Sequence, residues 1–172
     1  MEAIVHANHE DAQDVPQELR DQLLDPFIVA VTTALREWGG VEAVATESYQ
    51  RAQPAPFGAF AATIDLTFPT KGGTLLLGFS RAFADALAGR VLADAVVDVD
   101  DNLVRDCLAE LANVTAGQAK ALLHGTPFRI TFATPIIVAP TAQTDSQDCD
   151  WLVATIACDL GEFSLQVGVS RE

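Results

Sequence analysis

The segment LVRDCLAELANVTAGQAKALLHG, residues 103–125, has the periodicity of an amphipathic helix, and the rest of the chain can be interpreted around it. At 100° per residue, Asp106, Glu110, Asn113 and Gly117 fall on one face. The opposite face carries small or apolar residues, namely Val104, Cys107, Leu108, Leu111, Thr115, Ala119 and Leu122. We therefore expect this helix to bury one face against a sheet and to expose the other.

The residues on the exposed face are unfavourable for a helix whose outer face needs only to be solvated. Asp106 and Glu110 are like charges four residues apart, which repel each other on a helix surface. Asn113 and Gly117 are poor residues for a helix interior and together cost about 1 to 1.5 kcal/mol relative to alanine. This pattern favours a functional face, with an ordinary solvated face as the alternative.

Composition narrows the classes of protein. Apolar residues make up 49% of the 172 residues and charged residues 20%, which is typical of a globular domain. The formal net charge is −14, so we expect neither nucleic acid nor an anionic membrane as a partner. Three cysteines without CxxC spacing predict free thiols in a reducing compartment. With no apolar run of membrane-spanning length and no signal-like start, we expect a cytoplasmic protein.

The rest of the chain predicts an α+β fold in two layers, with helices packed on a six-stranded antiparallel sheet. Asp25 is a candidate N-cap for a helix that Gly39 and Gly40 end, and Ser80 caps a second helix over 80–93. The expected strands are 41–51, 58–68, 73–79, 128–138, 151–159 and 161–170. The second and third strands should form one hairpin and the last two another.

Residues 1–24 are expected to be an acidic, partly mobile extension before a domain of residues 25–172, with a short helix from Pro16 to Leu24. The pair His6 and His9 in this extension is a poor metal site.

Charged or titratable residues occur before the helix of residues 103–125 and near its end. The cluster Asp98, Asp100 and Asp101 could bind a cation, but a solvated helix N-terminus is favoured. Lys120 is interpreted as a solvated residue of the helix, and His124 with Gly125 as its end.

No phosphate-binding glycine loop, nucleophile elbow or metal-ligand cluster is present in the sequence. The run DxxxExxNxxxG on a helix, with Pro135 following Asn113 after 21 intervening residues, resembles the CheC/CheX/FliY family of chemotaxis phosphatases. The resemblance extends over residues 25–170. The chain is similar to CheX-type members, because only one such helix is present.

The resemblance implies an enzyme that hydrolyses the aspartyl phosphate of a CheY-like response regulator. Asn113 would orient the attacking water, and Glu110 would pair with the active-site lysine of the partner. Asp106 and Gly117 would contact the partner, and Pro135 would shape the sheet near the site. The protein would need no cofactor or metal of its own, because Mg²⁺ would be held by the response regulator. A homodimer is also implied.

Two other classes of function remain open at this stage. The same fold could serve as a non-catalytic adaptor that binds a receiver domain or a flagellar switch component. A small-molecule-binding protein is the third class, although the sequence shows no convergent polar pocket.

Overall fold

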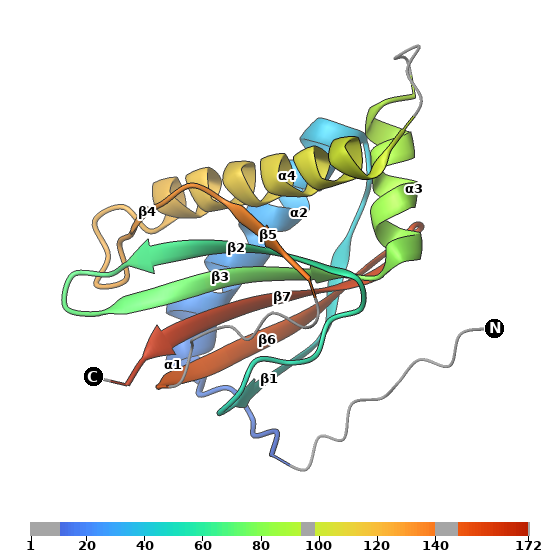
Figure 1. The fold of residues 1–172 in the computed structure, drawn as a ribbon. Helices are drawn as coiled ribbons and strands as arrows, with labels where there is room; N and C mark the ends of the chain where they lie inside the picture. Colours follow the sequence, from blue (N-terminus) through green and yellow to red (C-terminus); the bar gives the residue numbers. More distant parts are fainter. Residues whose placement is uncertain (1–10, 94–98, 140–147, 172) are drawn as a thin grey trace.

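The computed structural model describes residues 11–93, 99–139 and 148–171, which form an α+β fold with helices on one face of an antiparallel sheet. Figure 1 shows α2 and α4 lying on the same side of the sheet, with α3 standing at its end. The helices are α1 (Gln17–Leu19), α2 (Asp25–Gly39), α3 (Arg81–Val91) and α4 (Asp101–Leu122). The strands are β1 (Val44–Arg51), β2 (Phe60–Thr67), β3 (Gly72–Phe79), β4 (Thr131–Phe132), β5 (Ile136–Val138), β6 (Cys149–Cys158) and β7 (Gly161–Ser170). The predicted fold class is confirmed.

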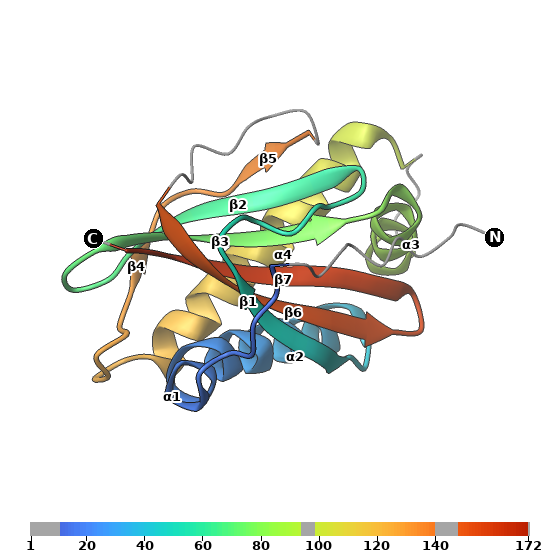
Figure 2. The same ribbon diagram turned by 90° about the horizontal axis from the view of Figure 1, so that it is seen from below.

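The strand order is β1-β6-β7-β3-β2-β4, and β5 also pairs with β2. Both predicted hairpins are present, since β2 pairs with β3 and β6 with β7 in antiparallel register. Figure 2 shows β1 at one edge of the sheet and β5 at the other. The two hairpins therefore form the centre of the sheet, and β1 joins it far from its neighbours in sequence.

The expected strand 128–138 is divided into β4 and β5, so the described part of the sheet has seven strands rather than six. Phe132 pairs with Leu66, and Ile136 pairs with Thr63. Four residue steps on this segment thus face three steps on β2, which leaves one extra residue, as in a β-bulge. Pro135 lies inside the bulge, where its missing N–H breaks no ladder hydrogen bond.

The first helix differs from the expectation. Asp25 is not an N-cap, because the helical run begins at Gln17 and passes through a π-helical turn, Arg20–Leu24, directly into α2. A proline inside an α-helix would clash with the preceding turn, and Pro26 follows the point where that turn is widened. Leu23 and Leu24 are fully buried in the main core. The boundary expected before residue 25 stays a prediction, and residues 1–10, including His6 and His9, lie outside the described residues.

The end of α2 and the start of α3 follow the local signals expected from the sequence. Gly40 adopts the left-handed conformation (φ 63°), and its N–H donates to the Arg36 carbonyl. The Ser80 hydroxyl accepts a hydrogen bond of 3.1 Å from the Phe83 N–H, so it caps α3.

All three cysteines are free thiols. No helix in the described ranges is long and apolar enough to cross a membrane.

Candidate functional site on helix α4

Helix α4 is held between α2 and the β2–β5 edge of the sheet, and its buried side belongs to the main core. The buried residues are Val104, Cys107, Leu108, Leu111, Ala112, Thr115, Ala116 and Ala119. They repeat at three- and four-residue intervals, which is why the helix turns a single face inward. Leu122 was expected on this face but is 49% exposed, because it lies at the last residue of the helix while Leu123 turns into the core.

The outward side of α4 carries the four predicted site residues, and all four are exposed: Asp106, Glu110, Asn113 and Gly117. Glu110 and Asn113 are three residues apart, which places their Cβ atoms about 5 to 6 Å from each other on a helix. Among the described residues, neither side chain makes a hydrogen bond or an ion pair. A carboxylate and a carboxamide are therefore presented together, on a rigid element, with their polar atoms available to another molecule.

The amino-terminal end of α4 is held by two acidic side chains. The Asp100 carboxylate accepts a 2.9 Å hydrogen bond from the Leu103 N–H and caps the helix, which therefore starts two residues before the predicted segment. Asp101 pairs with Arg81 at 2.7 Å. Asp98 lies outside the described residues, and no group of three or more potential metal ligands occurs in the ranges that the structure covers.

Cys107 lies directly behind the site and is only 7% exposed. Burial raises the pKa of its thiol, and the neighbouring carboxylate of Asp106 raises this pKa further. A raised pKa keeps the thiol protonated and weakens it as a nucleophile. Cys107 is thus a packing residue of α4.

Gly117 leaves the surface of α4 open. A Cβ atom built at this position would meet no atom within 4 Å. A shallow hollow begins here and is lined by Gly117, Lys120, Ala121 and His124. Pro135 is half-buried and immediately precedes β5, the strand that lies beside α4. The bulge therefore lies near the same helix as the four exposed residues, although it comes from a different part of the chain.

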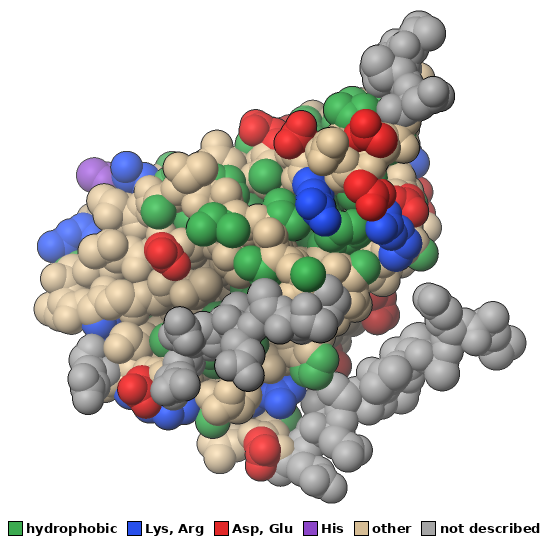
Figure 3. Space-filling view, viewed as in Figure 1, with side chains coloured by type: hydrophobic (Ala, Val, Ile, Leu, Met, Phe, Trp, Pro, Cys, Tyr) green, Lys and Arg blue, Asp and Glu red, His purple; other side chains and the backbone are tan. Residues whose placement is uncertain are grey.

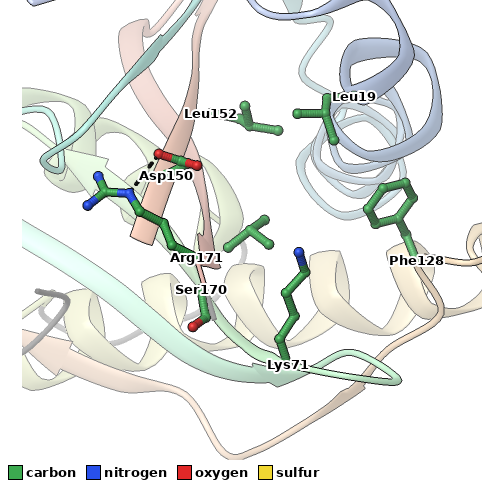
Figure 4. Close-up of a pocket in the computed structure, with 8 residues that line it drawn as sticks. Leu19, Lys71, Phe128, Asp150, Leu152, Ser170 and Arg171 are labelled. Carbon is green, nitrogen blue, oxygen red and sulfur yellow. Dashed lines mark hydrogen bonds and ion pairs between the residues drawn. The ribbon is translucent and has the colours of Figure 1, made fainter. Parts of the chain in front are cut away.

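A separate pocket lies at the end of the sheet near α1, where the C-terminal end of β7 and the start of β6 meet (Figure 4). Its walls include the apolar side chains of Leu19, Phe128 and Leu152. Two of its polar residues, Arg171 and Asp150, are joined in a 2.9 Å ion pair and so partner each other. None of the predicted site residues lines this pocket. The α4 site is therefore an exposed helix face outside this pocket, and of its residues Gly117 borders the shallow hollow described above.

Comparison with known structures defines the class of protein first: the fold is that of the CheC-like chemotaxis proteins. The crystal structure of a CheX chemotaxis protein from Desulfovibrio desulfuricans matches with a TM-score of 0.73 at 22% identity, over 85% of this chain and 97% of that one. CheX from Vibrio vulnificus matches with a TM-score of 0.70 at 18% identity, over 86% and 98%. A CheX–CheY–BeF3–Mg²⁺ complex from Borrelia burgdorferi matches with a TM-score of 0.64 at 16% identity, over 86% and 97%.

Sequence similarity identifies the family to which the chain belongs. The family described as chemotaxis phosphatase CheX matches residues 60–155, more than half of the chain and all of α4. The chain therefore belongs to the CheX family. No curated protein matches it significantly in sequence.

Proposed function

We propose that this protein is a phosphatase that hydrolyses the aspartyl phosphate of a CheY-like response regulator. The observation that carries the proposal is the exposed pair Glu110 and Asn113, one turn apart on α4 and without side-chain partners among the described residues, in a member of the CheX family. The structural relative from Borrelia burgdorferi, in which CheX is bound to CheY with BeF3 and Mg²⁺, supports this choice of partner.

The shape of the site favours a protein substrate. An exposed helix face cannot enclose a small molecule or exclude water by itself. It can complete the active site of a partner that already holds the reacting phosphoryl group. Phosphoryl transfer depends mainly on in-line positioning and charge stabilisation, so a small number of correctly placed groups is enough.

Each residue of the pair has a different role in this proposal. The carboxamide of Asn113 can accept one hydrogen bond from a water molecule and donate another, so it would hold the nucleophile in line with the phosphorus atom. The carboxylate of Glu110 would pair with the lysine in the phosphorylation site of the response regulator. This ion pair would set the depth at which Asn113 enters the partner.

The surrounding residues would support the approach of the partner. Gly117, which has no side chain, would let the loops of the partner come close to α4, and Asp106 would contact the partner beside Glu110. Pro135, through the bulge before β5, would act only by shaping the edge of the sheet beside the helix.

The metal and the oligomeric state are proposals from the family resemblance. The Mg²⁺ would be held by carboxylates of the response regulator and would neutralise charge on the phosphoryl group. Two copies of this chain would form a homodimer.

The test measures the rate at which ³²P is lost from a Mg²⁺-loaded, phosphorylated receiver domain that comes from the same organism as this protein. We expect the wild type to accelerate this loss, and Glu110→Ala and Asn113→Ala each to reduce the acceleration by about 100-fold or more. Asn102→Ala is the matched control, because Asn102 is also exposed on α4 but lies near its amino-terminal end. This control should retain full activity.

The outcomes separate the proposed enzyme from an adaptor. Binding of the phosphorylated receiver without any change in its lifetime would identify an adaptor, and the catalytic roles would then be wrong. Equal losses in Asn102→Ala and Asn113→Ala would show a general effect on the helix rather than a role for the carboxamide.

A further inference from the structure

The segment that runs from the middle of α4 to the end of β5 has an unusual charge. Residues 111–139 contain no Asp or Glu, although about one residue in seven of the whole chain is acidic. The charged or titratable residues of this segment are Lys120, His124 and Arg129. In a chain with a net charge of −14, this is a long interruption of the acidic surface.

The fold brings these three side chains together. Lys120 and His124 line the shallow hollow that begins at Gly117. The same two residues line an adjoining hollow with Arg129, between the end of α4 and the β2–β3 turn. Two open hollows with a shared basic wall thus continue from the candidate site toward the carboxyl end of α4.

The net charge along α4 therefore changes from negative to positive, with Arg105 as the one basic residue in its first half. Asp101, Asp106 and Glu110 all lie in the first half of the helix, and Lys120 lies in its last turn. Figure 3 shows most of the acidic side chains, together with some basic ones, near the α3 end of α4, and basic and His side chains without acidic neighbours at the opposite end. Asn113 and Gly117 lie between the two regions.

In the part of the chain that the structure describes, these three basic side chains have no partner that would account for their position. Among the described residues, the side chains of Lys120, His124 and Arg129 form no ion pair and no hydrogen bond. Four other basic residues of the chain are paired with carboxylates, namely Arg20, Arg81, Arg90 and Arg171. A cation near a helix C-terminus gains from the helix dipole, but Arg129 lies beyond the helix, and the side chains of Lys120 and His124 donate to no described helix carbonyl.

We propose that Lys120, His124 and Arg129 form a basic docking surface for an acidic patch on the phosphorylated protein, next to its phosphoryl group. This inference rests on the proposed function. The basic end of α4 would attract the patch and the acidic end would repel it, so the partner would bind in one orientation with its phosphoryl group over Asn113. Charges placed at a rim in this way act mainly on the association rate, its salt dependence and the choice of partner.

The experiment compares Lys120→Glu/Arg129→Glu with wild type, using the Mg²⁺-loaded, phosphorylated receiver domain. We expect KM for dephosphorylation to rise at least about tenfold while kcat stays within about twofold, because the reversed charges touch the partner and not the reacting atoms. Affinity for the receiver loaded with BeF3 should fall by the same factor, and the salt dependence of binding should become weaker. Arg90→Glu, an equal charge change per site on α3, is the control, and thermal unfolding verifies that each variant is folded.

The two proposals fail in different ways. Turnover with an unchanged KM in the double variant would overturn the docking surface and leave the phosphatase. If the wild type binds the receiver without turnover and the double variant binds it more weakly, the docking surface is supported and the phosphatase is overturned. If Arg90→Glu weakens binding as much per charge, or if the double variant changes only the self-association seen by sedimentation, the docking surface is wrong. Absence of both binding and turnover would overturn both.

Discussion

Arg81, the first residue of α3, donates from both terminal guanidinium nitrogens to both carboxylate oxygens of Asp101, the first residue of α4, at 2.7 and 3.2 Å. The Arg81 guanidinium also lies over the Phe60 ring, 4.9 Å from its centroid. A bidentate pair of this kind restricts orientation as well as distance. The start of the helix that carries the candidate site is thereby tied to α3 and to β2.

The Arg81–Asp101 pair predicts that the stability of the fold depends on pH. The hydrogen bond from Arg81, followed by the charge of Arg81, lowers the pKa of Asp101 below its ordinary value of 3.8. A carboxyl group with a lowered pKa in the folded state adds stability above its unfolded pKa and loses it as the pH falls through the folded pKa. NMR titration should therefore place the Asp101 midpoint below 3.8, and Arg81→Met should return it toward that value. An unchanged midpoint in Arg81→Met would contradict this. Arg90→Met, on the same helix, is the control.

Gly117→Ala should change stability and activity in opposite directions. The position is in the interior of α4, and an added Cβ meets nothing within 4 Å, so helix propensity should raise the free energy of unfolding by about 0.5 to 1 kcal/mol. If the partner approaches α4 closely at Gly117, the same methyl group should raise KM for the phosphorylated receiver. Urea unfolding and dephosphorylation kinetics measure the two effects. A more stable variant with unchanged kinetics would show that close approach does not occur here.

Gln166 is a buried polar side chain that is hydrogen-bonded to the β1–β2 connection. It is fully buried, accepts a 2.8 Å hydrogen bond from the Ala55 N–H and donates a 3.0 Å bond to the Ala55 carbonyl. Gln166→Leu removes the partners of two backbone groups, so we expect a loss of about 2 kcal/mol in the free energy of unfolding. Chemical denaturation measures it, with Gln22→Leu, at an exposed helical position, as the control that should change stability little. Equal stability of the two variants would mean that the Ala55 groups find other partners.

Gly40→Ala and Gly89→Ala are the same substitution with opposite expected signs. Neither position has an atom within 4 Å of the added Cβ, so packing does not enter. Gly40 has φ 63°, where a side chain is strained, and alanine should cost about 1 kcal/mol. Gly89 lies within α3, where alanine should add about 0.5 to 1 kcal/mol. Urea unfolding of both variants measures the difference, and a shared sign would contradict the assignment.

The candidate site could be located from sequence because it lies on one helix. The inward face of α4 follows from a 3.6-residue repeat, and the caps at Ser80 and Gly40 depend on neighbouring residues only. For the same reason, the exposure of Glu110 and Asn113 could be expected, and their catalytic roles stay predictions. The spacing of Asp106, Glu110 and Asn113 was also enough to indicate the family, which the comparison with known families confirmed.

Other features were decided by contacts between distant parts of the chain. The pairing of β1 with β6 joins residues about one hundred positions apart, and no local pattern encodes that choice. The extra residue at Pro135 exists only relative to the register of β2. The continuous helix through Arg20–Leu24 depends on burial of Leu23 and Leu24 in the main core.

The basic docking surface, formed by Lys120, His124 and Arg129, also depends partly on sequence and partly on tertiary structure. Their sequence signal is the absence of acidic residues from 111 to 139, which is visible in the chain but has no direction in space. Only the packing of the end of α4 against the β2–β3 turn places the three side chains around adjoining hollows. The sequence by itself therefore determined most of the elements and the composition of each helix face, because these depend on short-range periodicity. The tertiary structure decided which elements meet, because that depends on burial of apolar surface and on strand pairing between distant residues.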